Sequence, residues 1–223
     1  MERNIKRSFL LNLLIFVLTL LAVAMIMTGF RFSGGEAVLT AKKLAAFKYF
    51  TMDSNVLMGL TALLYALWER KREPPVWLRL LKLTATVGVT LTLLTVALFL
   101  GPFVMGMDRF LSLYADSNLF LHLIIPLLSI VAYVCTERSR AIRFRQTWFG
   151  VIPMVIYGAF YMANVLRHME GGRVSFQYDW YGFAQGGPAA SVVVFFGMIL
   201  VTWLISVVLW RMNRGRGTAD AKR

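Results

Sequence analysis

The chain has 223 residues, of which 58% are hydrophobic, and its 24 lysines and arginines outnumber 11 aspartates and glutamates for a formal net charge of +13. This composition excludes a soluble domain, because the apolar residues form blocks about as long as the roughly 20 residues that cross a bilayer. The basic residues lie between these blocks rather than on a folded basic surface. They therefore indicate topology determinants and contacts with anionic lipid headgroups, and no nucleic-acid partner is expected.

Six apolar blocks predict an all-α polytopic membrane protein, with one bundle of six transmembrane helices formed by residues 1–223. The spans are expected at residues 9–28, 51–68, 83–104, 119–134, 149–165 and 189–210. The first block follows basic residues as a signal peptide does. Its apolar run from Phe9 to Phe30 is longer than the core of a normal signal peptide, so we expect it to remain as the first helix.

The lysines and arginines predict the orientation of the bundle. The N-terminus, the loop between spans two and three, the loop between spans four and five, and the tail together hold 17 of them, including Arg79 and Lys82, whereas the opposite side holds seven. Positive charge favours the cytoplasmic side, so both termini are expected in the cytoplasm. The outer segment from Ala37 to Phe47 has the pattern of a short interfacial helix with snorkelling lysines.

A polar stripe opens the second span. On a helix that begins at Tyr49 or Phe50, Thr51, Ser54 and Asn55 fall at positions i, i+3 and i+4 and share one face. A threonine hydroxyl becomes a nucleophile when a base lies within hydrogen-bond reach. Threonines in helices commonly donate to the carbonyl four residues earlier, so Thr51 alone is more typical of a structural hydroxyl than of a nucleophile.

The fourth span supplies a base. His122 is the only histidine within a predicted span, and an imidazole that titrates near neutrality can pass protons. Pro126 lacks the N–H that would pair with the carbonyl of His122, so the helix is expected to kink there. A structural role, in which His122 hydrogen-bonds across to another helix, explains the residue as well.

Orientation places these polar residues at one depth. Spans two and four begin on the outer side and span five ends there, so Thr51 and His122 are expected near Asn118, Tyr161 and Asn164. Polar groups are costly in hydrocarbon, and their accumulation predicts a pocket that opens toward the outer leaflet. Tyr161 is a candidate for binding substrate. The candidates for orienting the imidazole or donating to an oxyanion are Ser54, Asn55, Asn118 and Asn164.

No cofactor or metal is expected. The two histidines and scattered carboxylates have no metal-ligand spacing, and no phosphate-binding loop or dinucleotide fingerprint is present. Cys135 is the single cysteine, which excludes an intramolecular disulfide and a thiolate metal cluster. The segment from Tyr178 to Pro188 is aromatic and turn-rich, as is typical of an interfacial cap before the last helix.

The Lys48-Tyr-Phe-Thr51 and Leu121-His-Leu-Ile-Ile-Pro126 motifs, together with the six-span layout, resemble the androgen-induced-gene-like integral membrane proteins, a family that includes the androgen-dependent TFPI-regulating protein. The resemblance runs from Thr51 to the sixth span. It implies that Thr51 and His122 are the catalytic pair of a hydrolase that cleaves fatty-acid esters of hydroxy fatty acids. The short loops and arginine-rich tail indicate a bacterial branch, and hence the bacterial inner (plasma) membrane.

The sequence therefore predicts a membrane threonine hydrolase that cleaves lipid esters through an acyl-threonine intermediate. The alternative is a non-catalytic lipid-binding or regulatory membrane protein. Membrane lipids are the partner in either case, as substrate or as ligand. A small-molecule transporter is disfavoured because a transport path needs polar residues through both leaflets. The cytoplasmic halves of spans two and four carry few polar residues, mainly Thr61, Tyr65, Ser129 and Tyr133.

Overall fold

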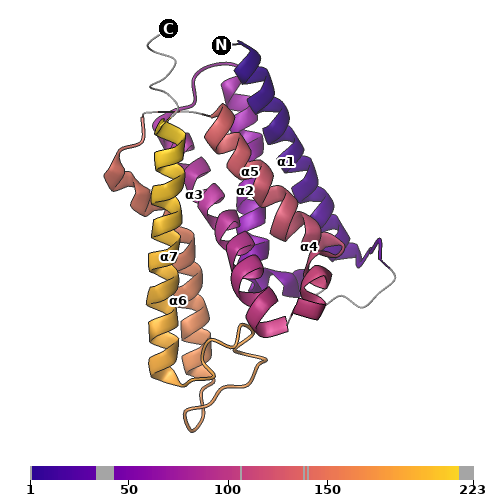
Figure 1. The fold of residues 1–223 in the computed structure, drawn as a ribbon, viewed down its shortest axis with the longest axis vertical. Coiled ribbons are helices and arrows are strands. Elements are labelled where there is room, and N and C mark those ends of the chain that lie inside the picture. The colour runs from indigo at the N-terminus through magenta and orange to yellow at the C-terminus, as the bar shows by residue number, and fades with distance from the viewer. Residues whose placement is uncertain (1, 34–42, 106, 138, 140, 216–223) are drawn as a thin grey trace.

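A computed structural model describes residues 2–33, 43–105, 107–137, 139 and 141–215 as a bundle of helices (Figure 1). Six helices in these ranges are long and apolar enough to cross a membrane: Ile5–Thr28, Phe50–Glu69, Val76–Leu100, Ser117–Thr136, Phe144–Arg167 and Pro188–Arg214. No β-strand occurs in the same ranges. The all-α, six-span prediction is confirmed. Helix α1 begins and helix α7 ends at the same end of the bundle (Figure 1).

The helical elements follow the spans with several short interruptions. In chain order they are α1 (Glu2–Thr28), η1 (Lys43–Lys48), α2 (Phe50–Glu69), α3 (Val76–Thr95), η2 (Val96–Met105), η3 (Met107–Tyr114), α4 (Ser117–Leu119), η4 (Phe120–Ile124), α5 (Ile125–Val131), η5 (Ala132–Thr136), η6 (Phe144–Val151), α6 (Ile152–Arg167) and α7 (Pro188–Gly215). Elements α4 to η5 together form the fourth span. Of the interfacial helix expected at 37–47, η1 is the part within the described residues.

Helix α3 is the centre of the bundle. One of its faces, with Leu83 and Val87, packs in a buried cluster with residues of α6 and α7. Another face, with Ala85 and Val89, packs in a second cluster with residues of α1, α2 and α5. A helix covered on both sides by apolar neighbours buries most of its side chains, and α3 therefore joins the two halves of the bundle.

Helix α3 begins earlier than expected. It starts at Val76 after the β-region residue Pro75, whereas the prediction placed its first residue at Leu83. Proline is favoured at a helix start because its missing N–H is not needed there. Assignment of Arg79 and Lys82 to the preceding loop was therefore wrong: both lie in α3, and Lys82 is completely buried.

The fourth span departs from regular α-helix around His122. The N–H of Ile125 donates to the carbonyl of Phe120, five residues earlier, which widens the turn to a π-helix. Pro126 explains this widening, because it cannot donate to the carbonyl of His122. The distortion expected beside His122 is thus present as a π-helical turn.

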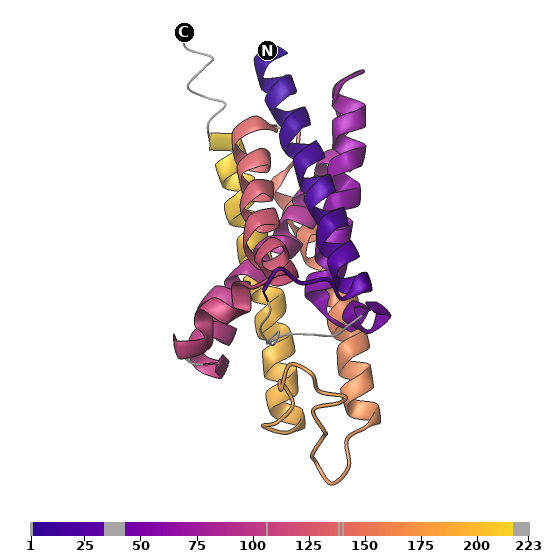
Figure 2. The same cartoon turned by 90° about the vertical axis from the view of Figure 1, so that its right-hand side faces the viewer.

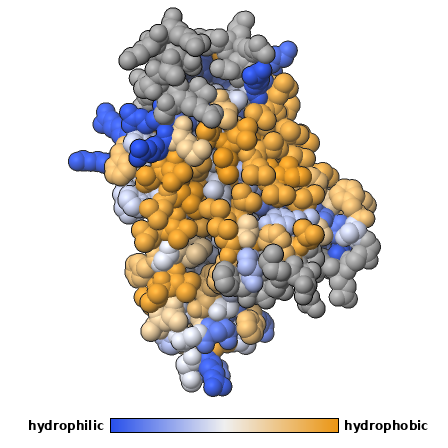
Figure 3. All heavy atoms as spheres, viewed as in Figure 1, coloured by the Kyte–Doolittle hydropathy of each residue, from blue (hydrophilic) through white to orange (hydrophobic). Residues whose placement is uncertain are grey.

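The outer surface of the bundle suits a lipid environment. Hydrophobic residues cover the lateral face in Figure 3, and hydrophilic residues gather toward the ends. Elements η2 and η3 leave the bundle sideways in Figure 2, and the segment from 168 to 187 folds beyond the ends of α6 and α7. This second segment borders the site described next.

Candidate functional site

An apolar cavity lies among α2, α3, η2, α6, α7 and the 168–187 segment. The space between its lining atoms, counted together with the open surroundings that it joins, is about 640 Å³. Its apolar lining includes Leu91 and Val96 of α3 and η2, Met154 of α6, and Phe195 and Met198 of α7. A cavity with this lining is typical of a site for an apolar ligand.

Hydroxyl groups interrupt the apolar lining, and most of them already have partners. Thr92 donates to the carbonyl of Val89 at 2.8 Å, Ser191 to the carbonyl of Gly187 at 3.1 Å, and Tyr157 to the carbonyl of Lys48 at 2.6 Å. Tyr161 donates to the carboxylate of Asp179. These four hydroxyls are therefore occupied by the protein itself.

The hydroxyls of Thr51 and Thr95 are different. Both line the cavity, and neither forms a hydrogen bond with any part of the chain that the structure describes. Other hydroxyls of the bundle follow the expected structural pattern: Thr86 donates to the carbonyl of Lys82 at 2.8 Å and Ser129 to that of Ile125 at 2.7 Å. Thr51 lies in the first turn of α2, directly after Phe50, so its own helix offers no carbonyl four residues earlier.

A polar anchor holds the 168–187 segment against the cavity. The buried carboxylate of Asp179 accepts from the backbone N–H groups of Phe183 and Ala184, both at 3.0 Å, from the side-chain amide of Gln185 at 2.8 Å, and from Tyr161. Asn164 donates to the carbonyl of Tyr178 at 2.8 Å. The segment is thus a fixed wall of the cavity.

Tyr181 joins this wall to the start of α2. The backbone N–H of Phe50 donates to the Tyr181 hydroxyl at 3.0 Å, which satisfies one of the free N–H groups of the helix terminus. Burial raises the pKa of Tyr181 well above its ordinary value, so the phenol stays neutral. Sequence reasoning missed Tyr157, Tyr181 and Phe183, although the aromatic composition of the 178–188 segment was a usable signal.

His122 lies outside the lining of the cavity. The residue is 5% exposed, and Nδ1 of its ring has no partner among the described residues. No hydrogen bond joins it to Thr51 within the described ranges. Asn55 connects the two regions, because its amide donates to the carbonyl of Thr51 at 2.8 Å and to that of Leu121 at 3.1 Å.

The remaining predicted site residues support the surroundings of the cavity. Ser54 is buried, donates to the carbonyl of Thr51 at 3.1 Å, and packs so closely on Gly88 that an added Cβ there would lie 3.2 Å from Ser54 Cβ. Asn118 is buried in α4. The structure therefore places Thr51 and Tyr161 at the cavity. Ser54, Asn55, Asn118, His122 and Asn164 lie outside its lining.

Together these features define a six-helix membrane protein with an apolar cavity at the end of the bundle away from the chain termini. Residues 115–216 are similar to a family described as a protein of unknown function (DUF1600). No curated protein and no solved structure matches the chain.

Proposed function

We propose that the protein binds a membrane lipid ester, with an acyl chain in the apolar cavity and the ester carbonyl at the Thr51 hydroxyl. The observation that supports this proposal is the position of Thr51: a hydroxyl without a protein partner at the wall of an apolar cavity. Thr51 is partly exposed, and a hydroxyl that faces an apolar wall without a protein partner favours a ligand that accepts its hydrogen bond.

The hydrogen bond, rather than the acyl chain, selects the ligand. An acyl chain that moves from the bilayer into the cavity leaves one apolar surrounding for another, so its transfer contributes little free energy. A hydrogen bond inside a membrane protein contributes about 0.6 to 2 kcal/mol. A lipid with an ester carbonyl at the correct depth is therefore preferred over a hydrocarbon of the same length.

The proposal includes a membrane setting. With both termini in the cytoplasm of a bacterial inner membrane, the cavity lies in the outer leaflet. The basic residues at the end where the termini lie then contact anionic lipid headgroups, to which they are attracted electrostatically.

Hydrolysis of the bound ester is a second candidate, favoured by the placement of the Thr51 hydroxyl at the cavity and of Asn55 between Thr51 and Leu121. In this scheme His122 removes the Thr51 proton and the oxygen attacks the ester carbonyl. The alcohol leaves with the proton from the imidazolium, which gives an acyl-threonine. Water, deprotonated by His122, then releases the fatty acid and restores Thr51. The scheme requires a side-chain movement that brings the imidazole to the hydroxyl.

The two candidates separate in one experiment on the purified protein in lipid nanodiscs, with a radiolabelled fatty-acid ester of a hydroxy fatty acid. Retained ester measures binding, and released fatty acid measures hydrolysis. Thr51→Val removes the hydroxyl at almost constant volume and is expected to weaken retention about 3- to 10-fold, since it removes one hydrogen bond. Thr90→Val is the matched control, because Thr90 already donates to the carbonyl of Thr86 at 2.7 Å.

His122→Ala distinguishes the enzyme from the binder. If the protein only binds lipid, fatty acid is not released by the wild type and His122→Ala retains ester normally. If it is a hydrolase, Thr51→Val and His122→Ala each lower release by orders of magnitude, and the double variant is no worse than either. Equal retention by the wild type and Thr51→Val would overturn the binding proposal.

A further inference from the structure

The cavity presents a second hydroxyl without a protein partner, that of Thr95. Helix α3 contains five threonines, and the four that precede Thr95 each donate to a backbone carbonyl at 2.7 to 3.1 Å: Thr84, Thr86, Thr90 and Thr92. Thr95 is partly exposed and donates to no group in the described ranges, although the carbonyl of Leu91 lies four residues earlier in the same helix. Its hydroxyl therefore favours a ligand that accepts a hydrogen bond, as that of Thr51 does.

The packing of α2 on α3 places Thr51 and Thr95 at different depths. The two helices are consecutive spans joined by a short turn, so they run in opposite directions. A Cβ added to Gly88 would lie 3.2 Å from Cβ of Ser54, so these two residues are level. Thr51 lies three residues before Ser54 and Thr95 seven residues after Gly88. At a rise of about 1.5 Å per residue, Thr95 lies about 6 Å farther from the end with the chain termini than Thr51 does.

The two hydroxyls lie on the helix faces that meet each other. Thr95 follows Gly88 at i+7 in α3, and Ser54 follows Thr51 at i+3 in α2, so each hydroxyl shares a face with one member of the Gly88–Ser54 contact. Two hydrogen bonds of about 2.8 Å to one oxygen span at most roughly 5.6 Å, even in a straight line. The offset in depth exceeds this span, and the separation of two packed helices adds to it. The two hydroxyls therefore need two acceptor atoms.

The lining of the cavity indicates that both acceptors are neutral. It includes no lysine, arginine, histidine, aspartate or glutamate in the part of the chain that the structure describes. A carboxylate or phosphate placed there would lose its hydration without gaining a counter-charge. An ester carbonyl only accepts, so it brings no donor that needs a partner of its own in the apolar cavity.

We propose that the ligand is a neutral lipid with two ester groups, of the diacylglycerol class, with one carbonyl at Thr51 and the other at Thr95. Esters on neighbouring carbon atoms of glycerol place their carbonyl oxygens several ångströms apart. Because the cavity joins the open surroundings, one acyl chain lies in it while the second stays in the bilayer. This inference rests on the proposed function and narrows its ligand from lipid esters in general to neutral diesters.

Retention of three matched lipids tests the inference. The probes are radiolabelled 1,2-dioleoylglycerol and its two monoether analogues, in each of which one ester is replaced by an ether that lacks the carbonyl. The full-length protein is held in nanodiscs of ether-linked phospholipid, so the bilayer itself supplies no ester. Retained lipid is counted after exchange with protein-free nanodiscs. The wild type is expected to retain the diester about 3- to 10-fold better than either monoether, since each monoether loses one hydrogen bond.

Three variants assign the two hydrogen bonds. Thr95→Val is expected to weaken retention of the diester and of one monoether about 3- to 10-fold and to leave the other monoether unchanged. Thr51→Val is expected to weaken the diester equally and to reverse the order of the two monoethers. Thr92→Val is the matched control, because Thr92 lines the same cavity but already donates to the carbonyl of Val89 at 2.8 Å.

The wild type alone decides part of the result, whatever the variants do to folding. Equal retention of the diester and both monoethers would overturn the inference, as would normal retention of the diester by Thr95→Val. Monoethers that both respond to both variants would mean that the two hydroxyls share one carbonyl, which would also overturn it. In each case a weakened Thr51→Val leaves the proposed function standing, because that function needs only one carbonyl. If Thr51→Val is without effect as well, the proposed function fails too.

Discussion

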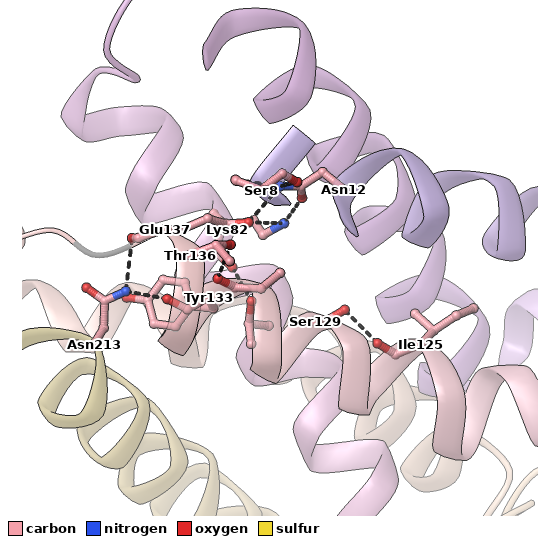
Figure 4. Close-up of polar contacts among 11 residues, drawn as sticks. Ser8, Asn12, Lys82, Ile125, Ser129, Tyr133, Thr136, Glu137 and Asn213 are labelled. Carbon is pink, nitrogen blue, oxygen red and sulfur yellow. Dashed lines mark hydrogen bonds and ion pairs between the residues drawn. The ribbon is translucent and has the colours of Figure 1, made fainter. Parts of the chain in front are cut away.

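The two ends of the bundle bury polar groups in different ways. At the cavity end, the polar groups are mainly neutral hydroxyls that donate to backbone carbonyls, and the carboxylate of Asp179 is satisfied by four donors. At the end with the termini, the Lys82 ammonium and the Glu137 carboxylate are buried against each other at 3.1 Å (Figure 4), and Oε2 of Glu137 has no partner among the described residues. The first end is organised to leave space for an apolar ligand, the second to hold charge.

The difference shows why polar residues in membrane helices have to be considered with their partners. A hydroxyl can use its own helix, so it costs little wherever it lies. A buried ammonium depends on a carboxylate from another span, and neither is tolerated without the other. Substitutions that remove one partner are therefore expected to affect the two ends very differently.

The largest effect is expected from Lys82→Met. The change leaves the Glu137 carboxylate buried without a counter-charge, which costs about 3–5 kcal/mol of unfolding free energy. Unfolding in a denaturing detergent, followed by circular dichroism, measures the loss. Lys82→Met combined with Glu137→Met removes both charges and is expected to recover most of the stability. If Lys82→Met alone unfolds like the wild type, the pair does not stabilise the bundle.

The sequence revealed one end of this comparison better than the other. Six spans follow from block length alone, whereas of the polar stripe from Thr51 to Asn55 only Thr51 lines the cavity. Lys82 was hidden among the basic residues that mark topology, and Glu137 directly precedes Arg138. Their pairing across about fifty residues is a tertiary contact, which local periodicity does not report. Tyr181 was missed for the same reason, since its role depends on reaching Phe50.

A second prediction concerns the wall of the cavity. Asp179→Asn replaces a carboxylate that accepts four hydrogen bonds by an amide that accepts fewer. The change is expected to lower the free energy of local unfolding of this segment by about 1–3 kcal/mol. Hydrogen exchange of residues 174–187 should then accelerate roughly 5- to 100-fold, and ester retention should fall. Glu170→Gln, an exposed change in the same segment, is the control. Unchanged exchange in Asp179→Asn would mean that the other contacts of the wall are sufficient.

A third prediction compares two glycines. A Cβ on Gly158 would lie 2.4 Å from the Phe195 ring, and a Cβ on Gly150 would lie 2.5 Å from the Ser206 hydroxyl. Phe195 lines the cavity and can rotate into it, whereas Ser206 is buried and donates to the carbonyl of Thr147 at 2.7 Å. Gly158→Ala is expected to lower the free energy of unfolding by less than about 1 kcal/mol and to reduce ester retention. Gly150→Ala is expected to lower the free energy of unfolding by about 1–3 kcal/mol. Equal stability losses in denaturing detergent would show that the Phe195 ring has no room to move.

The smallest effect is expected at the loop contact of Asp116, outside the cavity and the Lys82–Glu137 pair. Hydrogen bonds from the hydroxyl and the backbone N–H of Ser33 lower the pKa of Asp116 to about 2. Since the unfolded pKa of aspartate is about 3.9, the contact contributes stability above that pH and loses it as the pH falls toward 2. Hydrogen exchange at Phe32 and Ser33, normalised to a peptide of the same sequence at each pH, should accelerate between about pH 4 and pH 2. Asp116→Asn should remove this pH dependence. Protection that is constant across this interval in the wild type would mean that these amides are held without the Asp116 carboxylate, although its oxygen accepts from them at 2.7 and 2.8 Å.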